Sequence, residues 1–387
     1  MVKGESHIPK LRFKGFSDVW HKRKLKYFGK IKMCKRIFKE ETRLFGDVPF
    51  YKIGTFGKEA DSYISNALYD EYTSKFSYPN VGDILISASG TIGRTVVYNG
   101  EKAYYQDSNI VWLEHDQTKL ANTFLLQILN RSSWNELEGS TIKRLYNADL
   151  LNKVDVFPTL QEQTKIGDFF QKIDQVIELQ QKALDTARDY KKSMLQKMFP
   201  QKGEKVPQIR FDGFSGDWKY FMLEEITDRY DNLRIPITAS ERVLGDTPYY
   251  GANGIQGYVK GYTHDGENIL IAEDGANDLV DYPIQYVVGK IWVNNHAHVL
   301  SAKPTCDTKF LSYGMKNINF APFLVGGGRA KLNANVMMQI KLKIPKLEEQ
   351  QKIGAFFQKL DQRIEQHEKK LQSYQNLKKA MLQRLFV

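Results

Sequence analysis

The chain has only two cysteines among its 387 residues, Cys34 and Cys306, and they stand in different halves. Two isolated thiols offer neither a disulfide framework nor a CxxC metal site. No run of about 18 apolar residues occurs, so we expect no transmembrane helix. The first residues, MVKGESHIPKLRF, lack the apolar stretch of a secretion signal, and we therefore expect a cytoplasmic protein.

Several enzyme signatures are also missing. The sequence has no GxxxxGK[ST] phosphate loop, GxSxG elbow, HExxH pair or NPPY-like tetrapeptide. An amino-methyltransferase or nucleotide hydrolase would therefore have to be a different protein. His296 and His298 would share one face of a strand, but without a third ligand we predict a hydrogen-bonded or DNA-facing role and no metal site.

Acidic residues are absent from Val19 to Lys39, a stretch that holds nine lysines and arginines. The whole chain carries a formal net charge of +11, which favours a polyanion as partner. A block of this kind suits a track of phosphates, with Lys22, Arg23 and Lys24 as candidate contacts. A solvated basic face is the alternative.

Two nearly identical stretches organise the sequence, residues 158–199 and residues 345–386. PTLQEQTKIGDFFQKID returns 187 residues later as PKLEEQQKIGAFFQKLD, and KKSMLQKMF returns as KKAMLQRLF. Apolar residues three or four apart predict one helix of about 40 residues, roughly 60 Å long, in each stretch. Thr159 and Glu162 have the spacing of a capping box, and the repeated Gly167 and Gly354 suggest close backbone approach.

Each long helix has one narrow apolar seam, so it needs a partner along its length. We expect the two copies to pair with each other as an intramolecular coiled coil. Separate packing on two globular bodies, or pairing in a homodimer, are the alternatives.

The repeat extends beyond the helices. PKLRFKGFSDVW near the start returns as PQIRFDGFSGDW, and GDILISASG resembles ENILIAEDG. We therefore predict an α/β (α+β) fold of two homologous mixed bodies with a pseudo-two-fold internal repeat, separated by a pair of long antiparallel helices. The predicted boundaries are 1–157 for the first body, 158–199 for its helix, 200–206 for a linker, 207–343 for the second body and 344–387 for its helix.

The two bodies differ in their glycine-rich loops, SASGTIGRT in the first and YYGANGIQGY and GGGRAKLN in the second. Glycine lets the backbone approach a ligand, and arginine, asparagine and glutamine can bond to base edges or phosphates. The candidate DNA contacts in and near these loops are Lys52, Ser89, Thr91, Arg94, Thr95, Arg144, Tyr250, Asn253, Gln256, Tyr258, Lys260, Arg329, Lys331 and Asn333.

The repeated RFxGF segment, the two unlike bodies and the twin P-x-L-x-E-Q-x-K-I-G-x-FF-x-K-x-D helices together resemble the specificity (S) subunit of type I restriction-modification enzymes. The resemblance spans the whole chain. It implies that each body is a target recognition domain that reads half of a bipartite, asymmetric site in double-stranded DNA, while the helices set the spacing.

The resemblance further implies a non-catalytic chain that binds no cofactor itself. Two modification subunits would bring S-adenosylmethionine, and restriction subunits would bring ATP and magnesium. The helices would dock the modification subunits, with Phe169, Phe170, Phe356 and Phe357 as candidate contacts. From the residues alone, a coiled-coil interaction adaptor with incidental basic charge and a self-sufficient nuclease stay as alternatives.

Overall fold

The computed structural model describes residues 8–134, 144–326 and 330–386. These form two compact units, unit 1 (Met1–Leu179 with Leu371–Val387) and unit 2 (Gln180–Lys370). The division runs through both long helices, so each helix belongs partly to each unit. The predicted boundaries at the helix ends therefore follow a different division of the chain. No helix in the described ranges is both long and apolar enough to cross a membrane.

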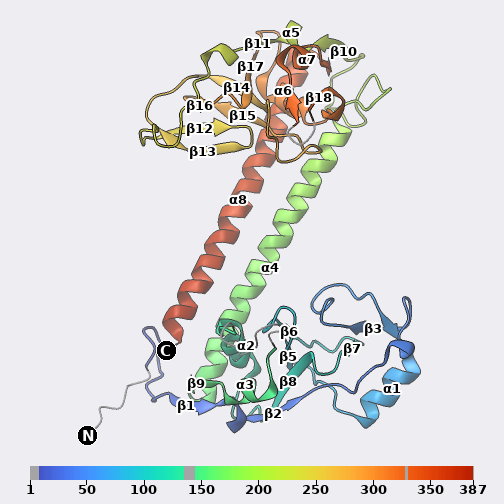
Figure 1. Ribbon diagram of the computed structural model, residues 1–387, viewed down its shortest axis with the longest axis vertical. Helices are drawn as coiled ribbons and strands as arrows, with labels where there is room; N and C mark the ends of the chain where they lie inside the picture. Colours follow the sequence, from blue (N-terminus) through green and yellow to red (C-terminus); the bar gives the residue numbers. More distant parts are fainter. Residues whose placement is uncertain (1–7, 135–143, 327–329, 387) are drawn as a thin grey trace. The chain divides into compact units, whose positions relative to one another are not determined.

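Unit 1 contains three small sheets with helices packed beside them (Figure 1). Their strand orders are β1-β9, β2-β8-β5-β6 and β4-β3-β7. The strands are β1 (His21–Lys24), β2 (Gly29–Lys32), β3 (Val48–Tyr51), β4 (Tyr63–Ile64), β5 (Ile84–Ser87), β6 (Thr95–Val97), β7 (Tyr104–Tyr105), β8 (Ile110–His115) and β9 (Val154–Phe157). The helices are α1 (Asn66–Lys75), α2 (Asn122–Arg131), α3 (Asn147–Asn152) and the first half of α4 (Leu160–Lys197).

Unit 2 repeats these three sheets and adds a short hairpin, β18-β19. The sheet orders are β10-β20, β11-β17-β14-β15 and β13-β12-β16. The strands are β10 (Lys219–Met222), β11 (Thr227–Arg229), β12 (Thr247–Gly251), β13 (Gly254–Val259), β14 (Glu267–Ala272), β15 (Ile284–Val288), β16 (Trp292–Val293), β17 (Ala297–Ala302), β18 (Leu324–Val325), β19 (Lys331–Leu332) and β20 (Lys341–Ile344). The helices are α5 (Leu223–Ile226), α6 (Thr308–Met315), α7 (Ala334–Met338) and the first half of α8 (Leu347–Leu385).

The two units have the same topology, sheet for sheet. In both, an antiparallel four-stranded sheet lies beside a three-stranded sheet with one parallel pair, β3 with β7 and β12 with β16. The strands are short because glycine and asparagine turns interrupt the apolar runs. The prediction of two homologous mixed α/β bodies is confirmed.

The long helices α4 and α8 are antiparallel partners, which also confirms the predicted pairing. In unit 1, Lys378 near the end of α8 forms an ion pair with Asp174 near the beginning of α4, at 2.6 Å. In unit 2, Lys191 forms the equivalent pair with Asp361. Lys191 and Lys378 are 187 residues apart, as are Asp174 and Asp361, so the same contact is made twice.

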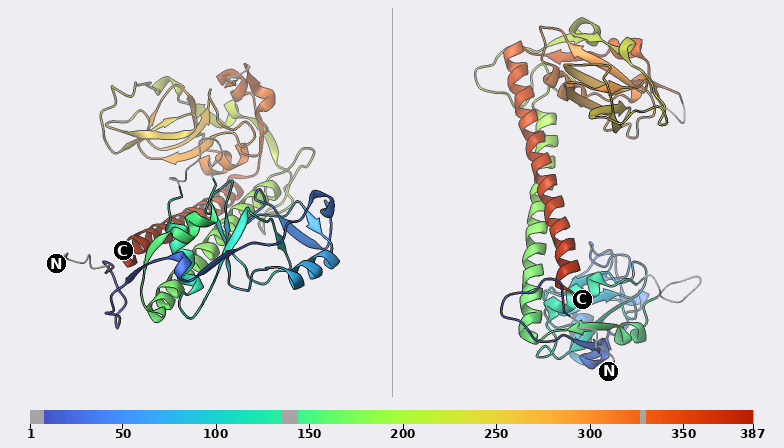
Figure 2. Two further views of the ribbon diagram at one scale, coloured as in Figure 1. Left: turned by 60° about the horizontal axis from the view of Figure 1, so that its bottom comes forward. Right: turned by 90° about the vertical axis from the view of Figure 1, so that its left-hand side faces the viewer.

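The end of each long helix inserts a phenylalanine into a core of aromatic rings. In unit 1, Phe386 packs against Trp20, Phe124 and Phe170, with ring centroids 5.2–6.4 Å away. Figure 2 shows the end of α8 beside the beginning of α4. Unit 2 has the equivalent cluster, in which Phe199 packs against Trp218, Phe310 and Phe357 at 5.3–6.0 Å. The end of one repeat therefore completes the core that the other repeat begins.

The RFxGF segment and the beginning of the long helix bind each other. Arg12 forms two hydrogen bonds with the buried Glu162, at 2.7 and 2.6 Å, and Trp20 Nε1 donates to the same carboxylate at 3.2 Å. Arg210 holds Glu349 in the same way, at 2.7 and 2.8 Å. Glu162 is thus bound by Arg12 and Trp20 rather than used for the predicted capping box with Thr159.

Gly167 and Gly354 stand where each long helix touches a neighbouring segment. A Cβ atom on Gly167 would lie 2.0 Å from Thr123 Oγ1, and one on Gly354 would lie 2.6 Å from Asp307 Oδ1. Close backbone approach is confirmed as the reason for both glycines. The clash that an alanine would cause outweighs the helix propensity of about 1 kcal/mol that it would gain.

Candidate nucleic-acid interface

The glycine-rich loops of each unit gather at one edge of its sheets. In unit 1, Arg94 Nη1 donates to the Phe56 carbonyl at 2.9 Å, which ties the β5–β6 loop to the loop after β3. In unit 2, Asn253 Nδ2 donates to the Gly275 carbonyl at 2.9 Å, which ties the loop after β12 to the loop after β14. Gly90 and Gly275 occupy equivalent positions with φ of 64° and 70°, a region that favours glycine.

The basic block of unit 1 is only partly available to a ligand. Lys22, Arg23 and Lys24 lie in β1, whose four residues are all exposed. Two of the other cations have internal partners: Lys30 lies 3.5 Å from Glu114, and Arg36 lies 3.0 Å from Asp107. The exposed strand is therefore the part that best fits a phosphate track.

Most of the polar candidates in the β5–β6 loop hold that loop together. Ser89 bonds to Asn109 at 2.8 Å, and Thr95 bonds to Asn130 at 2.6 Å. Arg144 Nη2 donates to the Ser108 carbonyl at 2.7 Å. Only Thr91 of this group is exposed, so the group as a whole shapes the loop more than it faces outward.

The candidates of unit 2 divide in the same way. Gln256, Tyr258, Lys260 and Asn333 are exposed, whereas Asn253 is engaged at both ends of its amide. Lys331 lies 3.0 Å from Glu273. Arg329 lies outside the described residues.

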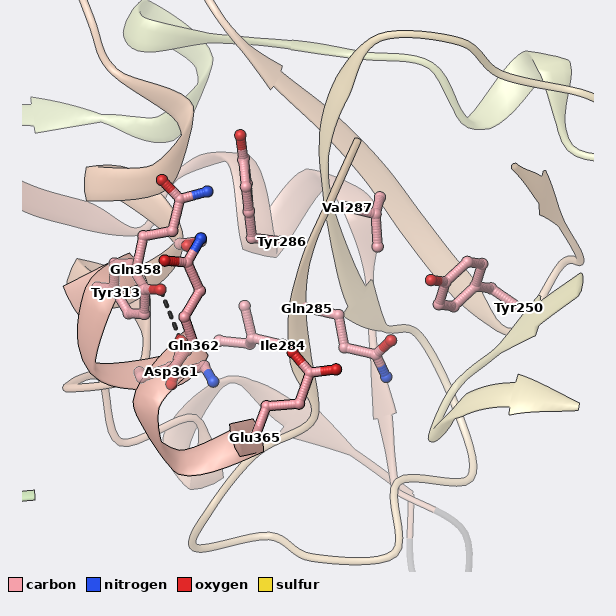
Figure 3. A pocket seen from close by; sticks show the side chains of 12 residues that line it. Tyr250, Ile284, Gln285, Tyr286, Val287, Tyr313, Gln358, Asp361, Gln362 and Glu365 are labelled. Atoms are coloured by element: carbon pink, nitrogen blue, oxygen red, sulfur yellow. Dashed lines mark hydrogen bonds between the residues drawn. The ribbon is translucent and has the colours of Figure 1, made fainter. Parts of the chain in front are cut away.

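Tyr250 is buried instead of facing a ligand from its loop, with 9% of its surface exposed. Its ring belongs to the apolar cluster of Leu270 and Val287, because β12 is covered on that side. Figure 3 shows Tyr250 across β15 from side chains of α8, in a hollow of about 440 Å³ that Gln285, Tyr286 and Glu365 also line. The Tyr313 hydroxyl donates to Asp361 there at 2.6 Å.

A buried charge network lies beside the loops of unit 2. His298 Nδ1 contacts Asp231 at 2.7 Å, and Arg234 Nη1 contacts Glu273 at 2.7 Å. Burial by itself would raise the pKa of Asp231, but the His298 hydrogen bond and charge bring that pKa below its ordinary value. Burial likewise opposes the lowering of the Glu273 pKa by Arg234 and Lys331, and the net direction is again down.

Asp231, Glu273 and His298 have ligand atoms within 4.8 Å of one another. Arg234 and Lys331 already supply positive charge to this group, and His298 Nε2 is committed to the Leu332 carbonyl at 2.8 Å. The donor set therefore fits an internal ion-pair network better than a metal ion. The network fixes β19 and the loop that precedes it. His296 bonds outside the group, to Asp274 at 2.5 Å.

The predicted docking phenylalanines face inward. Phe170 and Phe357 are fully buried in the aromatic cores. Phe169 and Phe356 are partly buried and covered by the RFxGF phenylalanines, Phe13 at 5.6 Å and Phe211 at 6.0 Å. The repeated FF pair therefore secures the long helix to its own unit, and in this structure it offers little surface to another subunit.

Sequence reasoning missed Arg43 and Arg242, which lie beside the loops at equivalent positions. The signal was present as a second repeat, because R-x-x-G-D-x-P-x-Y occurs at residues 43–51 and again 199 residues later. The spacing differs from the 187 of the helices, so a search at one fixed offset passes over it.

Comparison with known proteins agrees with this architecture. Residues 17–187 and 215–373, the greater part of the chain, match the family described as type I restriction modification DNA specificity domain. The chain belongs to this family. One match in each half accounts for the internal repeat.

Individual family members resemble the chain over different lengths. A Haemophilus influenzae protein named as a type I restriction enzyme specificity subunit is 54% identical over 147 residues, 38% of each chain. The EcoprrI specificity subunit of Escherichia coli is 31% identical over 30% of this chain and 28% of its own. The matched stretches thus span well under half of these relatives. The crystal structure of the S subunit from M. genitalium has a TM-score of 0.73 with 20% identity, covering 98% of this chain and 99% of that one, and so shares the fold.

Proposed function

We propose that this family member is the DNA-reading subunit of a type I restriction-modification complex, with each unit binding one half of a bipartite, asymmetric DNA site. The observation that carries the proposal is the duplicated scaffold with unlike loops. Sheets and core contacts repeat between the units, whereas the loops at the same sheet edge carry different polar side chains. Equal scaffolds with different reading surfaces suit two different half-sites on one duplex.

The long helices would set the distance between the half-sites. α4 has 38 residues and α8 has 39, which gives each a length of about 57 Å at 1.5 Å per residue. B-DNA advances about 34 Å per turn, so a spacer of this size leaves base pairs between the half-sites unread. The net charge of +11 and the exposed β1 strand supply sequence-independent attraction to phosphates.

The chemistry would reside in other subunits. Two modification subunits would bring S-adenosylmethionine, and restriction subunits would bring ATP and magnesium, with this chain non-catalytic. Because the FF pairs are largely internal, docking would fall to exposed apolar side chains on the long helices. Leu179, Tyr190 and Leu377 are 67%, 48% and 41% exposed.

Methylome sequencing of the source strain and of a strain that lacks this gene tests the proposal. We expect methylated adenines in one bipartite motif in the parent, their complete loss in the deletion strain, and their return on complementation. An unchanged methylome in the deletion strain would contradict the proposal and favour an interaction adaptor without a DNA role.

A further inference from the structure

Both units contain a polar pocket at the same place in the fold. In unit 1 it measures about 680 Å³ and lies between the segment before β3, β3 itself and the residues next to β4 and β7. In unit 2 it measures about 440 Å³ and lies between the segment before β12, β12 and the residues next to β13 and β16. These are corresponding elements, β3 with β12, β4 with β13 and β7 with β16 (Figure 1).

Strand register makes the correspondence residue by residue. Phe50 pairs with Tyr104 in unit 1, and Tyr249 pairs with Trp292 in unit 2. The N–H group of Gln106 donates to the Tyr51 carbonyl at 2.9 Å, and that of Asn294 donates to the Tyr250 carbonyl at 3.1 Å. Gln106 and Asn294 are therefore equivalent.

Asp61 and Gln256 are equivalent by the same reasoning. Asp61 precedes Ser62, whose carbonyl accepts from Phe50, and Gln256 precedes Gly257, which pairs with Tyr249. All of these equivalent side chains except Ser62 and Gly257 line their pocket or its strand, and both polar pairs, Asp61 with Gln256 and Gln106 with Asn294, line the pockets directly.

One wall of the two pockets is constant. Arg43 and Arg242 are identical, and an aromatic ring, Phe50 or Tyr249, lies beside them in each pocket. The Arg242 guanidinium stands over the Tyr249 ring with its Cζ 4.1 Å from the centroid, and its buried Nε has no hydrogen-bond partner among the described residues. An unpartnered donor held in a fixed orientation is suited to an external acceptor.

The rim beside the arginines is also constant in character. Phe45 is 84% exposed and Leu244, at the equivalent position, is 86% exposed. Large apolar side chains exposed at the same place in two otherwise different loops indicate a surface that contacts a ligand in both units.

The opposite wall differs in hydrogen-bonding chemistry. Unit 1 has the ion pair of Lys52 and Asp61, at 2.8 Å. Unit 2 has Gly251 in place of Lys52, and a Cβ there would lie 2.3 Å from Gln256 Nε2 and 3.2 Å from Asn294 Nδ2. The glycine thus makes room for two amides where unit 1 has a cation and a carboxylate.

We propose that these pockets are the base-reading sites of the two units: Arg43 and Arg242 bind the DNA backbone, Lys52 and Asp61 read a G·C pair, and Gln256 reads an A·T pair. The inference rests on the proposed function and names the residues that would carry it. Lysine suits guanine O6 and N7, a carboxylate accepts from cytosine N4, and glutamine matches adenine N6 and N7. A constant arginine can position the duplex without specifying sequence.

Reciprocal substitutions test the proposal in strains where each variant replaces the native gene and all partner subunits are present. We expect Asp61→Gln and Gln256→Asp to relax or change the methylated base at a position of different half-sites, with a 5- to 100-fold loss of preference, roughly, for the original base. Arg43→Ala and Arg242→Ala should lower the level of methylation and leave the motif intact. Asp70→Gln, on the exposed face of α1, is the matched control and should change nothing.

An unchanged motif and level in both Asp61→Gln and Gln256→Asp would overturn the assignment of the pockets. If a variant abolishes methylation, binding of the purified complex to duplexes with each half-site base varied in turn decides the question. A changed preference supports the proposal, and an equal loss on all duplexes overturns it. Failure of the proposed function itself is distinguishable, because the native and deletion strains would then share one methylome.

Discussion

Replacing Phe386 by alanine is expected to destabilise unit 1 by about 3–5 kcal/mol, the usual cost of removing a buried phenylalanine. The ring is 4% exposed and fills the space between Trp20, Phe124 and Phe170. Urea-dependent hydrogen exchange, followed by mass spectrometry of peptides from each unit, measures the effect where it arises. Peptides of unit 1 should lose protection, and those of the unit 2 core should change less.

Phe199→Ala supplies the mirror experiment, because Phe199 occupies the equivalent aromatic cluster of unit 2. Phe45→Ala is the matched control, since this ring is 84% exposed and its loss should cost no more than about 0.5 kcal/mol. Losses below about 1 kcal/mol for both Phe386→Ala and Phe199→Ala would show that the helix ends are not structural parts of the two cores.

Glu162→Ala should cost about 3–5 kcal/mol in the free energy of unfolding, because it leaves the Arg12 guanidinium without its partner in a mostly buried position. The side chain of Arg12 is 13% exposed and that of Glu162 is 0% exposed. Trp20 Nε1 would lose its acceptor as well. Denaturant unfolding of the purified chain measures the change.

The double variant Arg12→Ala with Glu162→Ala should cost clearly less than the sum of the single variants, because neither charge is then left unpaired. Lys30→Ala is the control, since its pair with Glu114 is exposed and worth at most about 1 kcal/mol. Additive costs in the double variant would mean that the RFxGF segment is not held by this ion pair. Glu349→Ala should cost slightly less, because Trp218 Nε1 does not share that carboxylate.

The fold could be predicted from the sequence to the extent that it repeats. The periodicity of the long helices and the recurrence of GDILISASG as ENILIAEDG are local signals, and they predicted the helical pair and the two related bodies correctly. The division into units was not predictable in the same way. Phe199 and Phe386 stand at helix ends in the sequence, and only tertiary packing shows that each completes an aromatic core.

The candidate site was less predictable, because polar residues in glycine-rich loops serve two purposes that look alike in a sequence. Arg94 and Arg144 have the composition of ligand contacts, yet each donates to a backbone carbonyl and shapes its own loop. Phe170 and Phe357 resembled a docking motif because they recur, whereas the recurrence reflects two equivalent cores. Repetition in a duplicated chain therefore marks scaffold, and the residues that differ at equivalent registers are better candidates for recognition.

The central claim is that two independent readers act on one duplex, and exchange of one body tests it most directly. Residues 22–157 would be replaced by the corresponding residues of another family member, and the methylome of the resulting strain would be sequenced. We expect one half of the methylated motif to change completely, while the other half and the number of unread base pairs stay as in the native strain. Changes in both halves, or an unchanged motif, would contradict the claim.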